Sequence, residues 1–188
     1  AEALRLCEKC WALGEKLFEH PLITKYFDQI QAAIPIAPGI RFVTGYNHDY
    51  LACTYSELLQ ASGKLEKALE IIQSLPASPS KRLAILDLYL SLKRYPEVID
   101  ATNGMTNEDQ MSTIAIIIRA VALRETGQAE LALEFLKMAV SKKSMGTEII
   151  NYGLYERACT YQVLNKLAYA RRDLNKILVT DYSNEAAQ

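Results

Sequence analysis

The sequence predicts an all-α fold, an α-α superhelix built from stacked helical hairpins. One helix–turn–helix pattern recurs four times between about residues 47 and 181, with turns at Gly63, Lys93-Arg94, Gly127 and Asn165. Successive turns begin at residues 63, 93, 127 and 165, so they lie 30, 34 and 38 residues apart. Spacings near 34 residues are typical of helical repeat arrays. Because such arrays mostly bind other chains, the pattern favours a binding protein over an enzyme.

The composition is that of an ordered protein with a sizeable core. The chain has 188 residues, of which 50% are hydrophobic and 23% charged, with a net charge of −1. A net charge near zero argues against a general nucleic-acid binder. The apolar run Ile114–Ile118 meets Arg119, which predicts a buried helix and no membrane span. Four cysteines without a disulfide-scaffold pattern predict a reducing, cytoplasmic compartment. Both ends resemble domain or proteolysis boundaries, which leaves open whether flanking domains exist.

Residues 1–46 are predicted to form a divergent N-terminal helical hairpin and a linker. A first helix is expected from Ala3 to Glu19, where His20-Pro21 ends it. A second is expected from Pro21 to Ala33, because large apolar residues recur there at helical spacing. Prolines and Gly39 then predict an irregular link, with at most an extended piece at Arg41–Thr44. This region lacks the repeat pattern, as a capping element would.

The repeat array is predicted to occupy residues 47–182, and residues 183–188 are predicted to be a frayed C-terminus. The expected helix pairs are 48–61 with 65–73, 80–92 with 96–102, 109–125 with 129–141, and 147–164 with 168–179. Turn-forming residues separate the pairs: Pro76 and Pro79, then Asn103-Gly104, then the stretch 142–146.

Small residues recur where the two helices of each pair would cross. The first helices carry Ser56, Ala120 and Ala158, and the second helices carry Ala68, Ala132 and Ala170. In this pattern the chain resembles the tetratricopeptide repeat (TPR) family over about 135 of its 188 residues, from 47 to 181. Close helix packing needs small residues at the crossing. The second unit departs from the pattern with Leu86, Val98 and no turn glycine, which indicates a degenerate repeat among about four.

The TPR resemblance implies a concave wall lined by the first helix of each pair. The partner-binding candidates on this wall are Tyr50, Glu57, Leu83, Asp87, Ile117, Val121, Arg124, Tyr152, Tyr155 and Gln162, with Cys53, Gln60, Leu90 and Cys159 beside them. The wall is apolar and aromatic, and it lacks the Lys/Asn/Arg set with which some family members clamp a carboxylate. An amphipathic helix or a mixed apolar extended segment suits it better. Two alternatives stay open: the N-terminal hairpin or a flanking segment fills the groove, or the surface serves self-association.

No catalytic residue, cofactor or metal ligand is predicted. Cys7 and Cys10 have zinc-ligand spacing but lack a second pair and lie inside an amphipathic helix, which favours core packing. Cys53 and Cys159 are expected to act as small apolar residues. The basic face formed by Arg171, Arg172 and Lys176, with Lys142 before it, is interpreted as solvated rather than as an RNA contact.

The leading functional hypothesis is therefore an adaptor or scaffold, not an enzyme, that binds a protein or peptide segment in the groove. The expected anchors are Tyr50, Ile117, Arg124, Tyr152 and Tyr155, since aromatics and arginine are the usual interface anchors. The first alternative is a regulatory or sensor helical module of a larger protein, such as an ATPase or a transcription regulator. The second alternative, which is less favoured, is a nucleic-acid binder that works through Arg171, Arg172 and Lys142.

Overall fold

A computed structural model describes residues 2–27 and 29–181 of the chain. They divide into two compact units. Among the described residues, unit 1 comprises residues 2–27, 29–36 and 41–92, and unit 2 comprises residues 37–40 and 93–181. The predicted frayed segment 183–188 lies outside the described residues. Over the part of the chain that is described, no helix has the length and apolar character needed to cross a membrane.

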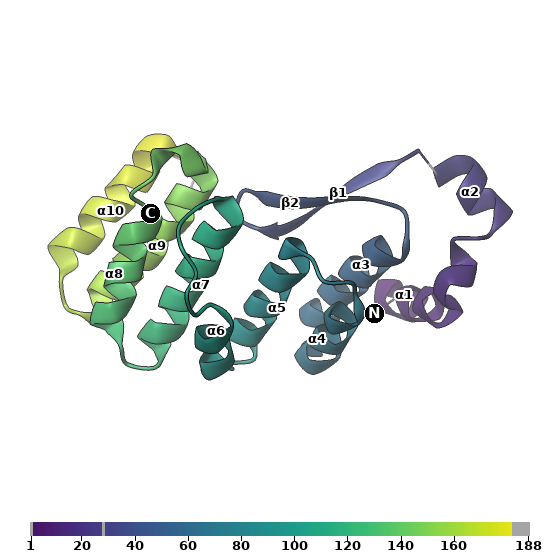
Figure 1. Cartoon of the computed structure of the whole chain (residues 1–188), viewed down its shortest axis with the longest axis horizontal. Helices are drawn as coiled ribbons and strands as arrows, with labels where there is room; N and C mark the ends of the chain where they lie inside the picture. The colour runs from purple at the N-terminus through teal and green to yellow at the C-terminus, as the bar shows by residue number, and fades with distance from the viewer. Residues whose placement is uncertain (1, 28, 182–188) are drawn as a thin grey trace. The chain divides into compact units, whose positions relative to one another are not determined.

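Unit 1 is a layer of helices with a β-hairpin beside it (Figure 1). Its elements are α1 (Glu2–Leu13), a 3-10 turn (Gly14–Leu17), α2 (Pro21–Phe27), β1 (Gln31–Ala37), β2 (Ile40–Gly45), α3 (His48–Ala61), α4 (Leu65–Ser74) and α5 (Pro79–Ser91). Asn47 caps α3, and its side chain accepts a hydrogen bond from the Tyr50 amide at 3.0 Å. Gly63, in the turn between α3 and α4, adopts the left-handed conformation with φ +77°.

The core of unit 1 forms where α1 and α4 pack on α3. Ala68 and Leu59 are fully buried, and Ser56 is 2% exposed, which confirms the predicted small residues at the α3–α4 crossing. On the other side of α3, the Trp11 ring of α1 lies 5.9 Å from the Tyr55 ring between centroids. Cys7 is buried in this core, as its helical position predicted.

The N-terminal region differs from the prediction because it contains a β-hairpin. The helix predicted over Pro21–Ala33 is wrong beyond its first turns: α2 ends at Phe27, and residues 31–37 pair with residues 40–45 as a two-stranded sheet. The link predicted to be irregular is therefore mostly strand, and the extended piece expected at Arg41–Thr44 is part of β2. Pro38-Gly39 makes the turn, and Gly39 at φ +74° after a proline matches a type II turn, whose second central residue needs a positive φ.

Unit 2 contains two long helical hairpins that pack side by side. Its elements are the hairpin tip 37–40, α6 (Tyr95–Ala101), α7 (Gln110–Glu125), α8 (Ala129–Ala139), a 3-10 turn (Lys143–Met145), α9 (Thr147–Val163) and α10 (Leu167–Thr180). α8 packs on its partner α7 and on the following helix α9, and α7 and α9 also contact each other. The turns fall where the sequence placed them: Lys93 and Asn165 adopt φ +57° and +55°, the conformation that glycine supplies at Gly127.

Small residues set the helix spacing in unit 2. Ala120 and Ala132 are fully buried where α7 crosses α8, and Ala158 and Ala170 are 1% and 3% exposed where α9 crosses α10. Gly153 lets α9 approach still closer, because a Cβ atom built there would lie 2.7 Å from Cγ1 of Val140 and 3.3 Å from Cδ1 of Ile117. These contacts confirm the close helix crossings that the TPR resemblance implied.

Gly153 gives a first testable consequence. Replacing Gly153→Leu forces a branched side chain into space that Val140 and the fully buried Ile117 already fill. Overpacking of this kind costs about 1–3 kcal/mol, so the urea midpoint followed by circular dichroism should fall accordingly. Leu131→Ala, at a 45% exposed position of α8, is the control and should leave the midpoint nearly unchanged. A midpoint for Gly153→Leu equal to that of the wild type would contradict the close approach of these helices.

Candidate functional site

In unit 1 the predicted wall residues line a pocket beneath β1. The pocket has a volume of about 160 Å³. Its walls are Ile34, Pro35 and Ile36 of β1, Cys53, Ser56, Glu57 and Gln60 of α3, Ile72 of α4, and Ala84 and Asp87 of α5. Glu57 and Asp87, from the first helices of two successive predicted repeats, thus meet at one pocket. The structure brings these two predicted residues together.

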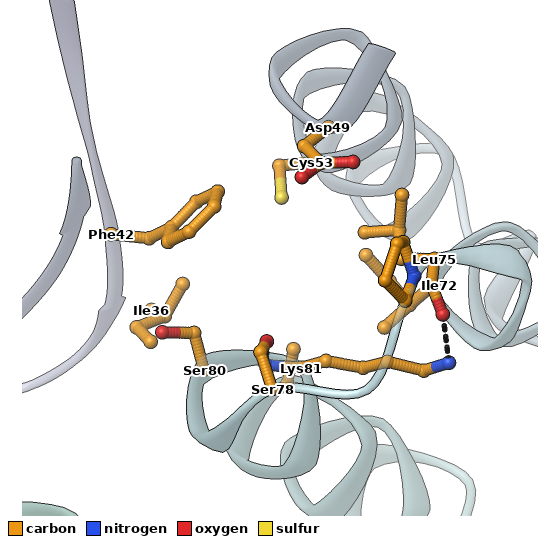
Figure 2. A pocket seen from close by; sticks show the side chains of 11 residues that line it. Ile36, Phe42, Asp49, Cys53, Ile72, Leu75, Ser78, Ser80 and Lys81 are labelled. Carbon is orange, nitrogen blue, oxygen red and sulfur yellow. Dashed lines mark hydrogen bonds between the residues drawn. The ribbon is translucent and has the colours of Figure 1, made fainter. Parts of the chain in front are cut away.

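A second pocket adjoins the first at the hairpin side of α3 (Figure 2). It has a volume of about 90 Å³. Its lining is Ile36, Phe42, Asp49, Cys53, Ile72, Leu75, Pro76, Ser78, Ser80, Lys81 and Ala84. Ile36, Cys53, Ile72 and Ala84 belong to both pockets, so the two pockets are adjacent, and together they are called the unit 1 trough. One end is apolar, and the other carries the two carboxyl groups.

Burial shifts the titration of the groups in the trough. It raises the pKa of the Cys53 thiol to about 11, with the nearby Asp49 and Glu57 adding to the shift. Desolvation by the surrounding walls also raises the pKa of the Glu57 and Asp87 carboxyl groups, although both residues remain accessible to water. Cys53 is therefore a neutral thiol at neutral pH and a poor nucleophile.

Of the other two predicted partner-contact residues in unit 1, one is half-buried and one lies in the core. Tyr50 is half-buried and its ring packs at a tilt against that of Tyr46, 4.6 Å away between centroids, while the Tyr46 ring meets that of Phe27 edge-on at 5.2 Å. Leu83 is only 2% exposed. The prediction that Leu83 contacts a partner is therefore wrong for this structure, because its side chain belongs to the core.

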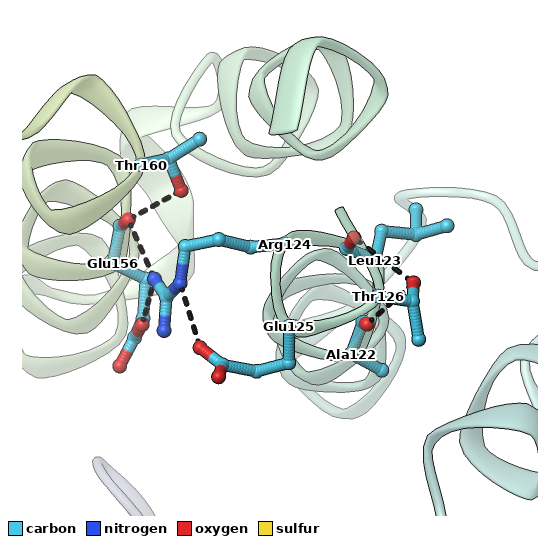
Figure 3. Close-up of polar contacts among 7 residues, drawn as sticks. All are labelled: Ala122, Leu123, Arg124, Glu125, Thr126, Glu156 and Thr160. Atoms are coloured by element: carbon cyan, nitrogen blue, oxygen red, sulfur yellow. Dashed lines mark hydrogen bonds and ion pairs between the residues drawn. The ribbon is translucent and has the colours of Figure 1, made fainter. Parts of the chain in front are cut away.

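In unit 2 the wall of α7 and α9 is joined by an ion pair (Figure 3). Arg124 Nη1 lies 2.8 Å from Glu156 Oε2, and both side chains are 13% exposed. Arg124 Nε also lies 3.1 Å from Glu125 Oε1, and the Thr160 hydroxyl donates to the Glu156 carbonyl oxygen at 2.8 Å. The guanidinium of Arg124, predicted as an anchor, is thus already paired and ties α7 to α9.

Tyr152 and Tyr155 line a pocket of about 280 Å³. Its remaining lining residues are Pro38 of the hairpin tip, Glu148, Asn151, Ile177 and Asp181. The pKa of the Tyr155 hydroxyl is raised, chiefly by the neighbouring Cys159, which also hydrogen-bonds to it. Burial in turn raises the pKa of the Cys159 thiol. Both groups are therefore uncharged at neutral pH.

The remaining unit 2 candidates have different positions. Val121 is half-buried on α7, and Gln162 is exposed near the end of α9. Ile117 is fully buried and faces Gly153, so the prediction that it contacts a partner is wrong. Its position on the first helix is correct, but α9 approaches so closely at Gly153 that Ile117 fills the interface between helices.

In the described part of the chain, neither the potential metal ligands nor the basic residues of α10 come together as a binding site. No group of three or more His, Cys, Asp or Glu side chains there could hold a metal ion. In the basic face of α10, Arg172 lies over the Tyr169 ring at 5.2 Å and 4.0 Å from Asp173, and Lys176 lies 3.3 Å from Asp173. These charges are partly compensated within the helix.

The hairpin and the trough were missed by sequence reasoning. The available signal was Pro38-Gly39 flanked by β-branched residues, a hairpin pattern. It was outweighed by the helical spacing of Leu22, Tyr26, Phe27 and Ile30, of which only the part up to Phe27 is helix.

Comparison with known proteins places the fold. Neither a protein-family model nor a curated protein matches the chain. Among solved structures, the N-terminal domain of the EccA1 ATPase from the ESX-1 secretion system of Mycobacterium tuberculosis matches 98% of this chain and 70% of its own, with a TM-score of 0.71 and 14% identity. YrrB, a TPR protein with an unusual peptide-binding site, matches 73% of this chain and 88% of its own at 17% identity, with a TM-score of 0.38 that is too low to add to the assignment. The fold is all-α and TPR-like.

Proposed function

We propose that this chain is a protein-interaction module that binds a partner segment at the first-helix faces of its repeats. The observation that carries the proposal is that predicted wall residues line a hollow in each unit. Glu57 and Asp87 do so in unit 1, and Tyr152 and Tyr155 do so in unit 2. The chemistry of these hollows suits recognition rather than catalysis, because the pKa of each cysteine beside them is raised.

The shape of the hollows favours a segment that inserts single side chains. Volumes of about 160 and 280 Å³ are small beside the 300–1,000 Å³ of typical small-molecule sites. Half-exposed tyrosines supply a large contact area at low cost in conformational entropy, which makes Tyr152 and Tyr155 suitable anchors. In unit 1, Ile34 and Ile36 of the β-hairpin line one hollow, so a partner there would lie beside the hairpin. In unit 2, Pro38 lines the other hollow.

We also propose that the protein works in a reducing, cytoplasmic compartment. All four cysteines are free thiols, and Cys53 lines the trough, where oxidation would change the shape of the hollow. A binding surface of this kind is best kept where thiols stay reduced.

Selection from a random peptide library tests the proposal without knowledge of the partner. Dodecapeptides displayed on phage would be selected on the immobilised wild-type chain. The recovery of each enriched clone would then be measured on the wild type and on Tyr155→Ala. Removing the ring deletes one wall of the unit 2 hollow, so recovery should fall about tenfold for the clones that use it. Tyr169→Ala is the matched control, because Tyr169 is a 50% exposed tyrosine on α10 and lines none of the hollows described above. Failure to enrich any clone, or equal loss with both variants, would overturn the proposal.

A second candidate function is a helical module within a larger ATPase. The observation that favours it is that the matched EccA1 structure is the N-terminal domain of an ATPase. At 14% identity the match shows the fold alone, so the ATPase context is a proposal for this chain. The complete reading frame of the gene tests it. A nucleotide-binding domain encoded in the same frame is expected, and a frame without one would exclude this candidate.

A further inference from the structure

We propose that the unit 1 trough binds an apolar side chain and a neighbouring lysine or arginine of an extended partner segment. The inference rests on the proposed function and names the partner chemistry for one of its two hollows. It is carried by the shape of the trough and by the distribution of apolar and charged groups along it.

The apolar end of the trough fits a single aliphatic side chain. Ile36 and Phe42 of the hairpin lie across an open space from Cys53 and Leu75 (Figure 2). The opening is about 90 Å³, which exceeds the roughly 10–15 Å³ that one water needs, and an apolar cavity gives water few partners. Filling it with an apolar group removes that surface from water and is favourable.

The other end of the trough presents two carboxylates that have no partner in the described chain. Glu57 and Asp87 make neither an ion pair nor a hydrogen bond with any described residue, although both line the same pocket. Gln60, the polar neighbour on α3, donates to Ser56 at 3.4 Å instead. The carboxylates therefore stay available to a ligand.

The remaining charges around the trough leave it negative. Asp49 lines the apolar end, and the Cys53 thiol is neutral because its pKa is raised to about 11. The one ammonium in the lining belongs to Lys81, which donates to the Gln73 carbonyl oxygen at 2.7 Å and also to that of Leu75. Since a concave acidic surface attracts cations, the complementary ligand carries a positive charge. Lysine and arginine fit best, because their aliphatic stems can lie along the apolar wall while the charge reaches the carboxylates.

The placement of the carboxylates also works against stability. Desolvation raises the pKa of both groups, so the folded state holds their protons more tightly than the unfolded chain does. The folded state is then favoured as pH falls through these pKa values and disfavoured above them. The double variant Glu57→Gln/Asp87→Asn is therefore expected to fold at neutral pH at least as well as the wild type. Residues that cost stability in the free protein fit a binding role.

Disulfide tethering at Cys53 tests the proposal with small probes of known charge. In a chain with Cys7, Cys10 and Cys159 changed to serine, Cys53 would be equilibrated with three disulfides in excess 2-mercaptoethanol. The three disulfides transfer to Cys53 an aminoethyl thiol (cationic), a hydroxyethyl thiol (neutral) or a carboxyethyl thiol (anionic), respectively. Capture is read by intact-protein mass spectrometry. We expect the cationic probe to be captured about fivefold more than the anionic one at neutral pH. The preference should disappear in Glu57→Gln/Asp87→Asn and weaken as acid protonates both carboxylates.

A chain that keeps only Cys159 is the matched control, because that thiol lies beside the neutralised Arg124–Glu156 pair. It should capture the three probes about equally. Equal capture at Cys53, capture of no probe there, or a preference that survives the double variant would each overturn the proposal. If Cys53 shows no preference while peptide selection still depends on Tyr155, only the cation-binding inference fails. If no peptide is enriched at all, the proposed function itself fails.

Discussion

Replacing Asp173 with alanine is expected to lower the free energy of unfolding by about 3–5 kcal/mol, because it leaves a buried charge without its partner. Arg157 of α9 binds the Asp173 carboxylate of α10 through two hydrogen bonds, Nε to Oδ2 at 2.7 Å and Nη2 to Oδ1 at 3.0 Å. The two side chains are 10% and 0% exposed. Urea unfolding followed by circular dichroism at 222 nm measures the loss.

Two controls separate this pair from the other charges of α10. Arg172→Ala removes a cation that is 55% exposed and 4.0 Å from Asp173, and it should cost less than about 1 kcal/mol. The double variant Arg157→Met/Asp173→Leu removes both charges and should be far more stable than Asp173→Ala. If Asp173→Ala were as stable as Arg172→Ala, the buried pair would not hold α9 and α10 together.

Leu59→Ala is the corresponding test in unit 1, with an expected loss of about 2–5 kcal/mol. Leu59 is fully buried on α3, in the core that α1, α3 and α4 share. Trp11 is the only tryptophan of the chain and packs on Tyr55 and His48 of α3, so its fluorescence reports on this unit. Leu6→Ala, at a 50% exposed position of α1, should leave the transition almost unchanged. Superimposable transitions of Leu59→Ala and the wild type would refute the assignment of this core.

The repeat array was predictable because its signals are local. A turn needs a residue that tolerates positive φ, and a close crossing needs a small one. Gly63, Gly127 and Asn165 are recognisable in sequence for the first reason, and Ala132 and Ala170 for the second. Lys93 shows that repeat spacing can locate a turn even where the residue type does not, since its φ is +57°.

The β-hairpin could not be predicted with the same rules. Tyr26, Phe27 and Ile30 are spaced as on a helix, yet the structure ends α2 at Phe27 and begins a strand at Gln31. A two-stranded sheet depends on pairing between segments, and each segment alone gives only a weak signal. Pro35 within β1 weakens that signal further, because proline is confined to strands with an unpaired edge.

The sequence placed some candidate site residues at hollows and others in the core. Glu57, Asp87, Tyr152 and Tyr155 line hollows, and partner binding there stays a prediction. Ile117 was assigned to the same face, but it is buried because Gly153 lets a neighbouring helix come closer than its repeat position implies.

The partners in ion pairs between different helices could not be predicted either, because such pairs depend on how the helices pack. Arg124 and Glu156 lie 32 positions apart, and only the folded structure shows that their side chains meet.

The central claim is that the hollows of the first-helix faces bind a partner segment. Its most direct test is the dissociation constant of a peptide selected on the wild type, measured by isothermal titration calorimetry against the wild type, Tyr155→Ala and Tyr169→Ala. For a peptide that binds in the unit 2 hollow, the dissociation constant is predicted to rise about tenfold or more with Tyr155→Ala and to stay unchanged with Tyr169→Ala. The same dissociation constant for all three proteins, with all three folded, would contradict the claim.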